Sequence, residues 1–131
     1  SDPIRQADFF ISQVKLEKGD LAPVLDIERK PRGKAQLQAD LVKFLNRLEQ
    51  HYGVKPIIYT SYKYMTRYLD TPEFAQYPLW IAHYYVDTLS YEGAWQFWQH
   101  TDYGTVPGID ESVDLNVFNG SLDGLQRYTL K

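Results

Sequence analysis

A short apolar run that ends in two acids, residues 21–28 (LAPVLDIE), constrains the fold of this chain most strongly. A run of Val, Leu and Ile bounded by turn residues is typical of a strand buried on both faces, as in a parallel sheet. Because side chains alternate along a strand, Asp26 and Glu28 are expected on one face, with Cα atoms about 6.6 Å apart. Carboxyls placed side by side drive their proton affinities apart, as a glycoside-cleaving acid pair requires. The spacing fits a second interpretation equally well, in which Glu28 has left the strand and pairs in solvent with Arg29 or Arg32.

Helix and strand signals alternate along the rest of the chain. Periodic apolar positions and capping residues predict helices, and continuous apolar runs between turn residues predict strands. Helices are predicted from Pro3 to about Val14 with Asp2 as the N-cap, over 37–52 with Gly53 as the stop, from 62 to about 69, as a short turn after Thr71, and from about 121. Strands are predicted over 21–28, 56–61, 77–84, 95–100 and 113–118, the last two as an antiparallel pair joined by a long loop, 101–112. This order argues for a parallel α/β sheet that ends in strands added without full helices.

Several side chains capable of chemistry lie where these strands end. In parallel α/β sheets the chemistry gathers at the carboxyl ends of the strands. For Tyr59 and Trp80 taken alone, a place in the core is favoured over contact with a ligand, but their position on the same edge as the acids favours the ligand. The residues expected at this edge are Asp26, Glu28, Tyr59, Tyr84, and Gln99 or His100.

Composition argues against several classes of function. The chain has 131 residues, enough for one domain with a core, and its net charge of -3 argues against nucleic acid as the main partner. It has no cysteine, no apolar run of membrane length and no phosphate-binding glycine loop. His51, His83 and His100 are scattered along the chain and are interpreted as structural, so no metal site is expected.

Five short motifs occur in the order found in one enzyme family. They are PVLDIE (23–28), IYTS (58–61), LWIA (79–82), WQ (98–99) and VDLN (113–116). Together they resemble glycoside hydrolase family 25, the Chalaropsis-type lysozymes or N-acetylmuramidases, over essentially the whole chain. The resemblance implies a modified TIM-type (β/α) barrel with five βα units followed by three strands. It also implies cleavage of the β-1,4 bond between N-acetylmuramic acid and N-acetylglucosamine in peptidoglycan, without a metal or an organic cofactor.

The resemblance assigns roles to individual residues. Glu28 matches the general acid, Asp26 the acid that stabilises charge or orients the N-acetyl group of the substrate, and Asp114 the carboxylate at the start of the last strand. The spacing of the pair leaves a retaining course (carboxyls about 5–5.5 Å apart) and an inverting course (about 6.5–9.5 Å) both open. The resemblance favours a third course, in which Asp26 orients the acetamido group of the substrate. The implied substrate-binding positions along the sugar groove are Tyr59, Trp80, Tyr84 and Gln99.

The chain departs from the family pattern at its amino end. The family begins with a strand that carries another active-site aspartate, and further βα units precede the helix on which this chain opens. We therefore expect one family 25 catalytic domain, residues 1–131, that lacks its amino-terminal third and keeps the last five strands of a (β/α)5(β)3 barrel. With both outer strands unpaired, the chain alone is expected to self-associate through open sheet edges or to be marginally stable, and to have little muramidase activity.

Two alternatives to a muramidase differ in class. One is a non-catalytic module that binds cell-wall glycan through its aromatic groove, and the other is a structural α/β domain in which the acid pair is accidental. Five motifs in register and three acids in place favour the enzyme. The expected partner is then a peptidoglycan glycan strand, without nucleic acid and without membrane insertion. The expected location is extracellular or at the cell wall, with a phage endolysin as a further possibility.

Overall fold

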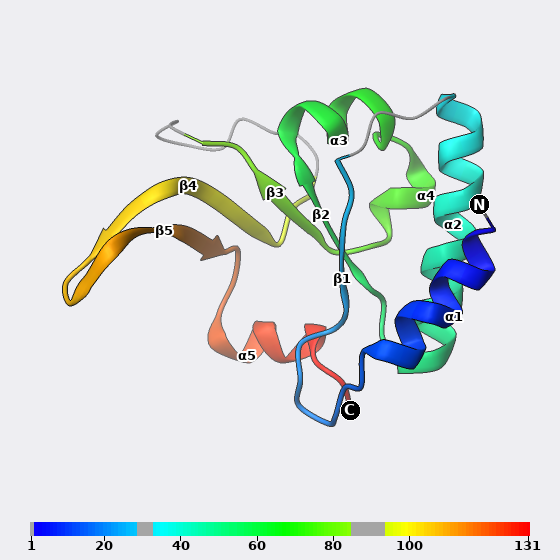
Figure 1. The fold of residues 1–131 in the computed structure, drawn as a ribbon, viewed down its shortest axis with the longest axis horizontal. Coiled ribbons are helices and arrows are strands. Elements are labelled where there is room, and N and C mark those ends of the chain that lie inside the picture. Colours follow the sequence, from blue (N-terminus) through cyan, green and yellow to red (C-terminus); the bar gives the residue numbers. More distant parts are fainter. Residues whose placement is uncertain (1, 29–32, 85–93) are drawn as a thin grey trace.

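The computed structural model describes the backbone of residues 2–28, 33–84 and 94–131, and within these the side chains of all but 100, 102–106, 109–115 and 122. Helices and strands alternate through the first two thirds, and a β-hairpin and a short helical end follow (Figure 1). In chain order the elements are α1 (Pro3–Gln13), β1 (Val24–Asp26), α2 (Lys34–Tyr52), β2 (Ile57–Ser61), α3 (Tyr62–Tyr68), α4 (Pro72–Ala75), β3 (Leu79–Ala82), β4 (Phe97–Val106), β5 (Ile109–Phe118), α5 (Leu122–Leu125) and the 3-10 helix η1 (Gln126–Tyr128).

The strands form one open five-stranded sheet in the order β1-β2-β3-β4-β5. The first four are parallel, and β5 runs antiparallel to β4. The register places five residues in one row across the sheet, so that their side chains share a face. From β1 to β5 this row is Asp26, Tyr59, Trp80, Phe97 and Phe118.

One face of the sheet is covered by helices α2, α3 and α4. Leu41, Leu45 and Leu48 recur at helical spacing along the buried side of α2, which explains why this stretch forms a helix packed on the sheet. Leu45 lies in the main core cluster with residues of β2, β3, α3 and α4. Leu48 instead contacts Ala7 and Ile11 of α1, so α1 packs against the carboxyl-terminal half of α2.

The other face, which we call the inner face, is closed at one end by α5 and η1. Its core cluster contains Ala22, Ile57 and Phe97, with the partly buried Phe118 and Tyr128 packed against them. Backbone hydrogen bonds tie the segment before β1 to the segment after η1: Ala22 N donates to Tyr128 O (2.7 Å). Gly19 N donates to Leu130 O (2.8 Å), Leu130 N donates to Asp20 O (2.8 Å), and Leu21 forms an antiparallel bridge with Thr129. The two ends of the described chain are therefore joined beside this cluster.

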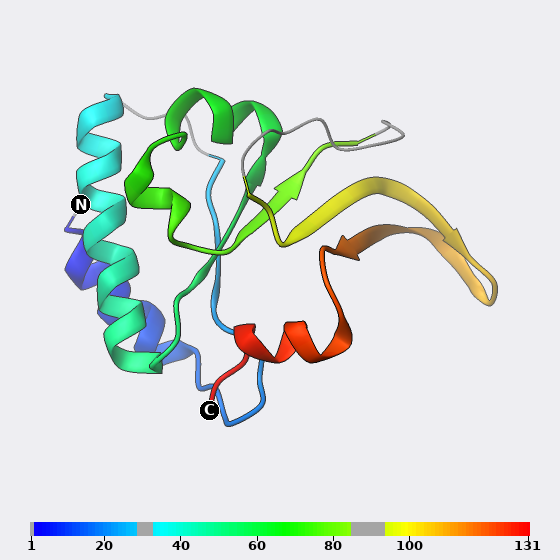
Figure 2. The same ribbon diagram turned by 180° about the vertical axis from the view of Figure 1, so that it is seen from behind.

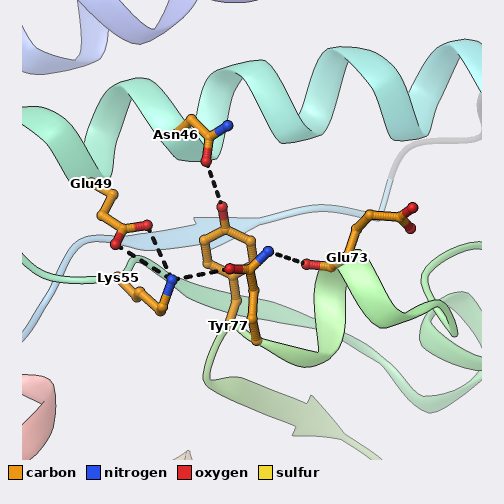
Figure 3. Close-up of polar contacts among 6 residues, drawn as sticks. Asn46, Glu49, Lys55, Glu73 and Tyr77 are labelled. Carbon is orange, nitrogen blue, oxygen red and sulfur yellow. Dashed lines mark hydrogen bonds and ion pairs between the residues drawn. The ribbon is translucent and has the colours of Figure 1, made fainter.

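A polar cluster ties α2 to the amino ends of β2 and β3 (Figure 3). The Tyr77 hydroxyl donates to Asn46 Oδ1 (3.0 Å). Lys55 Nζ contacts both carboxylate oxygens of Glu49 (3.3 and 3.4 Å) and donates to Gln76 Oε1 (3.1 Å). These contacts hold the end of the sheet that lies opposite the strand ends expected to carry the chemistry.

The local signals of helix ends are confirmed. The carboxylate of Asp2 accepts a hydrogen bond from Ile4 N (2.9 Å), and Pro3 occupies the first helical position of α1. Gly53 ends α2 with φ 77°, in the left-handed region where a residue without Cβ is favoured. All five predicted strands and the helices between them are present.

Two sequence predictions about strands are wrong. The first strand is three residues long and is not buried on both faces, because β1 lies at the edge of the sheet and Asp26 is exposed. The predicted loop 101–112 belongs to the strands of a hairpin, whose turn lies between the paired Val106 and Ile109. Pro107 and Gly108 make that turn, with Gly108 at φ 92°. The hairpin extends away from the rest of the molecule (Figures 1 and 2).

Candidate functional site

The two acids lie at the carboxyl end of β1, and β2 anchors the segment that carries them. Beyond Asp26 the backbone stays beside β2, since Ile27 N donates to Tyr59 O (3.0 Å). The hydroxyl of Thr60, which is fully buried, donates to Ile27 O. The strand itself ends at Asp26, so Glu28 lies two residues past it, as the second interpretation proposed, but on a fixed backbone. The proposed partners Arg29 and Arg32 lie outside the described residues.

The proton affinity of Glu28 is increased by its surroundings. Both acids are exposed as a whole, yet the pKa of the Glu28 carboxyl is raised above its ordinary value. Partial burial of the carboxyl is the largest cause, followed by the negative charge of Asp26 and a hydrogen bond with it. Because this residue is largely in solvent, screening keeps the effect of this shift on stability small. Glu28 therefore keeps its proton to a higher pH than an ordinary glutamate.

Two tyrosines meet one buried amide next to the acids. The hydroxyls of Tyr59 and Tyr84 both donate to Gln99 Oε1, and the distance from the Tyr84 hydroxyl is 3.2 Å. Gln99 is 5% exposed, so its side chain lies behind the two phenols. The pKa of Tyr59 is raised, first by burial, then by its hydrogen bond and charge interaction with Tyr84, and further by the charges of Glu28 and Asp26. Tyr59 is therefore an aromatic neighbour of the acid pair.

Trp80 continues this row of side chains toward β5. Its ring is 6.0 Å from that of Tyr59 in an edge-on arrangement and 4.8 Å from Phe97 in a stacked one. Its indole N–H donates to Asn116 Oδ1 (2.8 Å) on β5. The residue is half-buried and packs against the inner-face cluster, so it contributes to the core while part of it stays accessible.

Sequence reasoning missed Asn116 as a partner of Trp80. Asn116 lies two positions after Asp114 on β5, so alternation along that strand could have pointed to it. Asp114 itself is part of β5, but its side chain and that of His100 lie outside the described residues.

His83 lies at the end of β3, close to the same group. Its ring stacks on Tyr62 (4.4 Å between centroids). Its backbone N–H donates to Gln99 O (3.1 Å), and its carbonyl accepts from the Trp98 indole (2.8 Å). These contacts hold the ring and the backbone of His83 in place.

Neither acid lines the cavity at the other end of the sheet. A cavity of about 260 Å³ opens at the other end of the strands, with Lys55, Tyr77 and Arg127 in its wall, and it includes neither Asp26 nor Glu28. Within the described side chains, no group of three or more His, Asp or Glu residues could hold a metal ion. Of the helices described, none is both long and apolar enough to cross a membrane.

Comparisons with known proteins agree with this fold. Residues 1–109 match the model of a family described as "Glycosyl hydrolases family 25". The chain is 40% identical to the uncharacterized protein YegX of Escherichia coli (strain K12) over 125 residues, which are 94% of this chain and 46% of that protein. It is 30% identical to Lysozyme M1 of Streptomyces globisporus over 131 residues, covering 88% of this chain and 45% of that one.

A solved structure is also similar over nearly the whole chain. It is a family 25 glycosyl hydrolase from Bacillus anthracis, with a TM-score of 0.85 and 31% identity, covering 99% of this chain and 64% of the solved one. The chain thus spans about half the length of the curated relatives that it matches. The mixed α/β sheet is the fold of family 25 lysozymes.

Proposed function

The chain belongs to the glycosyl hydrolases of family 25, and on that premise we propose that it supplies the acid pair of a peptidoglycan-cleaving muramidase. The bond cleaved would be the β-1,4 bond between N-acetylmuramic acid and N-acetylglucosamine. The observation that carries the proposal is the position of Asp26 and Glu28 at the carboxyl end of β1, beside Tyr59 of β2. The raised pKa of Glu28 supports it.

Glu28 is proposed as the general acid. A general acid must hold a proton at the working pH and donate it to the leaving oxygen as the bond breaks. Burial of its carboxyl and the charge of Asp26 both favour the protonated form. Glycosidases of this kind pair one protonated carboxyl with one that remains charged.

Asp26 is proposed as the charged partner. Its carboxylate would stabilise the positive charge that builds on the sugar ring, or orient the acetamido group of the substrate so that this group attacks the anomeric carbon. The second course is favoured by the family resemblance. Asp114, on β5 at the far side of the sheet, is proposed as the third carboxylate of the site.

The aromatic side chains are proposed to line the glycan groove. Tyr59, Trp80 and Tyr84 follow one another across β2 and β3 and the segment after β3, beside the acids. Flat rings pack against the C–H faces of sugars while their polar ends make hydrogen bonds. The fourth predicted groove residue, Gln99, is 5% exposed, and its amide oxygen accepts hydrogen bonds from both phenols.

The sheet is proposed to form part of the barrel of one family 25 catalytic domain. The described strands form an open sheet whose outer members are β1 and β5, both of which carry proposed site residues. In a (β/α)5(β)3 barrel these two strands would pair with further strands and close the groove around the acids. Action outside the cell or at the cell wall, by a secreted enzyme or a phage endolysin, follows from the proposed substrate.

The test compares cleavage with binding in the full-length protein. Glu28→Gln should lower the release of dye from labelled cell walls by about 10²–10⁴-fold, the range for loss of a general acid. Co-sedimentation with the same walls should persist, because the amide keeps the shape of the carboxyl. Glu73→Gln is the matched control, since this exposed residue of α4 directs its carboxylate away from the polar cluster in Figure 3.

The outcomes separate the two candidate classes. Loss of dye release in Glu28→Gln alone, with binding retained by both variants, supports the muramidase. Wall binding without dye release by the wild type would favour a glycan-binding module that uses the same aromatic side chains. Residual activity of Glu28→Gln above about a tenth of wild type would remove Glu28 from the role of general acid.

A further inference from the structure

The buried amide of Gln99 lies at the centre of the proposed site and takes no part in the chemistry proposed for the acids. Gln99 is on β4, in register with Ala82 of β3 and Asn116 of β5, and its carbonyl accepts the N–H of His83 (3.1 Å). Neighbours on both sides therefore fix its backbone. With 5% of the residue exposed, its side chain has little access to a ligand.

The side chain of Gln99 has a defined hydrogen-bonding direction. An amide oxygen offers two lone pairs, and the two hydroxyls that donate to Gln99 Oε1 come from Tyr59 and Tyr84. A phenol hydroxyl has one proton, and the contacts of the two hydroxyls with Gln99 Oε1 and with each other use both protons within this group of three. Toward any other group each hydroxyl can therefore only accept a hydrogen bond. Both phenol oxygens are thereby set as acceptors toward the acid pair and the groove.

Tyr59 lies where a hydrogen-bond acceptor can affect the acid pair. Tyr59 is paired across the sheet with Asp26 and is close enough to both acids for their charges to act on it. Its pKa is raised, so the hydroxyl stays protonated and neutral over the range in which Glu28 titrates. A neutral acceptor beside two carboxyls can accept a hydrogen bond from a sugar hydroxyl, an amide N–H or protonated Glu28.

We propose that Gln99 is a positioning residue that fixes the hydroxyls of Tyr59 and Tyr84 as hydrogen-bond acceptors for N–H and O–H groups of the glycan. This inference rests on the proposed hydrolase for its effect on turnover, but the hydrogen-bonding state of the two tyrosines can be tested without activity. A Gln99 that only fills the interior would affect stability and leave both tyrosines unchanged.

The experiment uses Gln99→Met, which keeps an unbranched side chain of similar length and removes the strong acceptor. Gln96→Met is the matched control, because Gln96 Oε1 also accepts one hydrogen bond, from Leu79 N (2.7 Å), but at the amino end of β3. Both variants are made in the full-length protein with tyrosine labelled with carbon-13 at Cζ. The signals of Tyr59 and Tyr84 are assigned from Tyr59→Phe and Tyr84→Phe.

The expected result is selective. Gln99→Met should shift the Cζ signals of both tyrosines and lower kcat by up to about 100-fold, the scale on which small misplacements of active-site groups act. Gln96→Met should move neither signal and leave kcat unchanged. Gln99→Glu, which keeps two acceptor oxygens, should give both tyrosine signals close to their wild-type positions. This second variant keeps the test decisive if Gln99→Met does not fold.

Three outcomes decide the matter. Unmoved tyrosine signals in Gln99→Met would overturn the inference, as would shifted signals with unchanged kcat in an active enzyme. Failure of Gln99→Glu to keep the wild-type signals would overturn it too. If the wild type has no hydrolase activity, the proposed function fails, while the tyrosine signals still show whether Gln99 fixes the two hydroxyls.

Discussion

Replacement of Trp80 tests how one side chain serves the core and the proposed groove together. Full truncation of a buried Trp costs about 3–5 kcal/mol, and Trp80 is half-buried, so we expect about 2 kcal/mol from lost packing in Trp80→Ala. The hydrogen bond to Asn116 adds about 1 kcal/mol. At roughly 2.1 cal/mol/K of unfolding entropy per residue, a chain of 131 residues loses about 4 °C of Tm per kcal/mol. The expected loss for Trp80→Ala is therefore about 11 °C.

A second substitution separates packing from hydrogen bonding. Trp80→Phe keeps a ring against Phe97 and loses the N–H, so its Tm should fall by only about 4 °C. Asn116→Ala should cost a similar amount in the wild type and almost nothing in Trp80→Phe, because the shared hydrogen bond is already gone. Thermal unfolding followed by circular dichroism gives these values, and wall co-sedimentation shows whether binding falls as well. Equal losses for Trp80→Ala and Trp80→Phe, or additive losses when Trp80→Phe and Asn116→Ala are combined, would refute the reasoning.

Three further predictions concern the acids and the sheet edges. Asp26→Asn removes a charge that raises the pKa of Glu28, so the alkaline limb of the pH–activity profile should move to lower pH. A limb that does not move would mean that burial, and not the charge of Asp26, raises this pKa. A raised folded-state pKa means that stability falls as pH rises through the unfolded and then the folded pKa of Glu28. Glu28→Gln should therefore unfold at higher temperature than wild type at neutral pH but not at low pH, and equal melting at both would contradict this. The open edges at β1 and β5 should give concentration-dependent sedimentation, which Val117→Lys on β5 should reduce; a monomer at all concentrations would count against edge pairing.

The parts of the fold that follow from local chemistry could be predicted from the sequence. Asp2 and Gly53 mark helix ends because the cap and the left-handed turn depend on those residues and their immediate neighbours. The order of strands and helices, together with the rule on strand ends, placed Asp26 and Tyr59 at one edge, where the structure brings them together.

Features that depend on distant partners could not be predicted in this way. An apolar run has the same pattern in an edge strand and in a central one, so the edge position of β1 carried no local signal and was expected only from the family resemblance. The turn residues within 101–112 suggested a loop, whereas pairing of β4 with β5 across Pro107 and Gly108 makes most of them strand. The hydrogen bonds that Gln99 accepts come from phenols on β2 and on the segment after β3, and neither phenol lies near it in sequence.

The bridge between Leu21 and Thr129 has a consequence for how the chain acquires its structure during translation. Helix α2 and the strands that it covers can assemble as they leave the ribosome, since their contacts are made by consecutive elements. The inner face cannot be sealed until Tyr128 has been synthesised, because this ring packs on Phe97 and Phe118. Contacts between such distant positions form slowly. A nascent chain stalled before residue 128 would therefore leave Phe97 and Phe118 without this cover, and chaperones would meet it in that state.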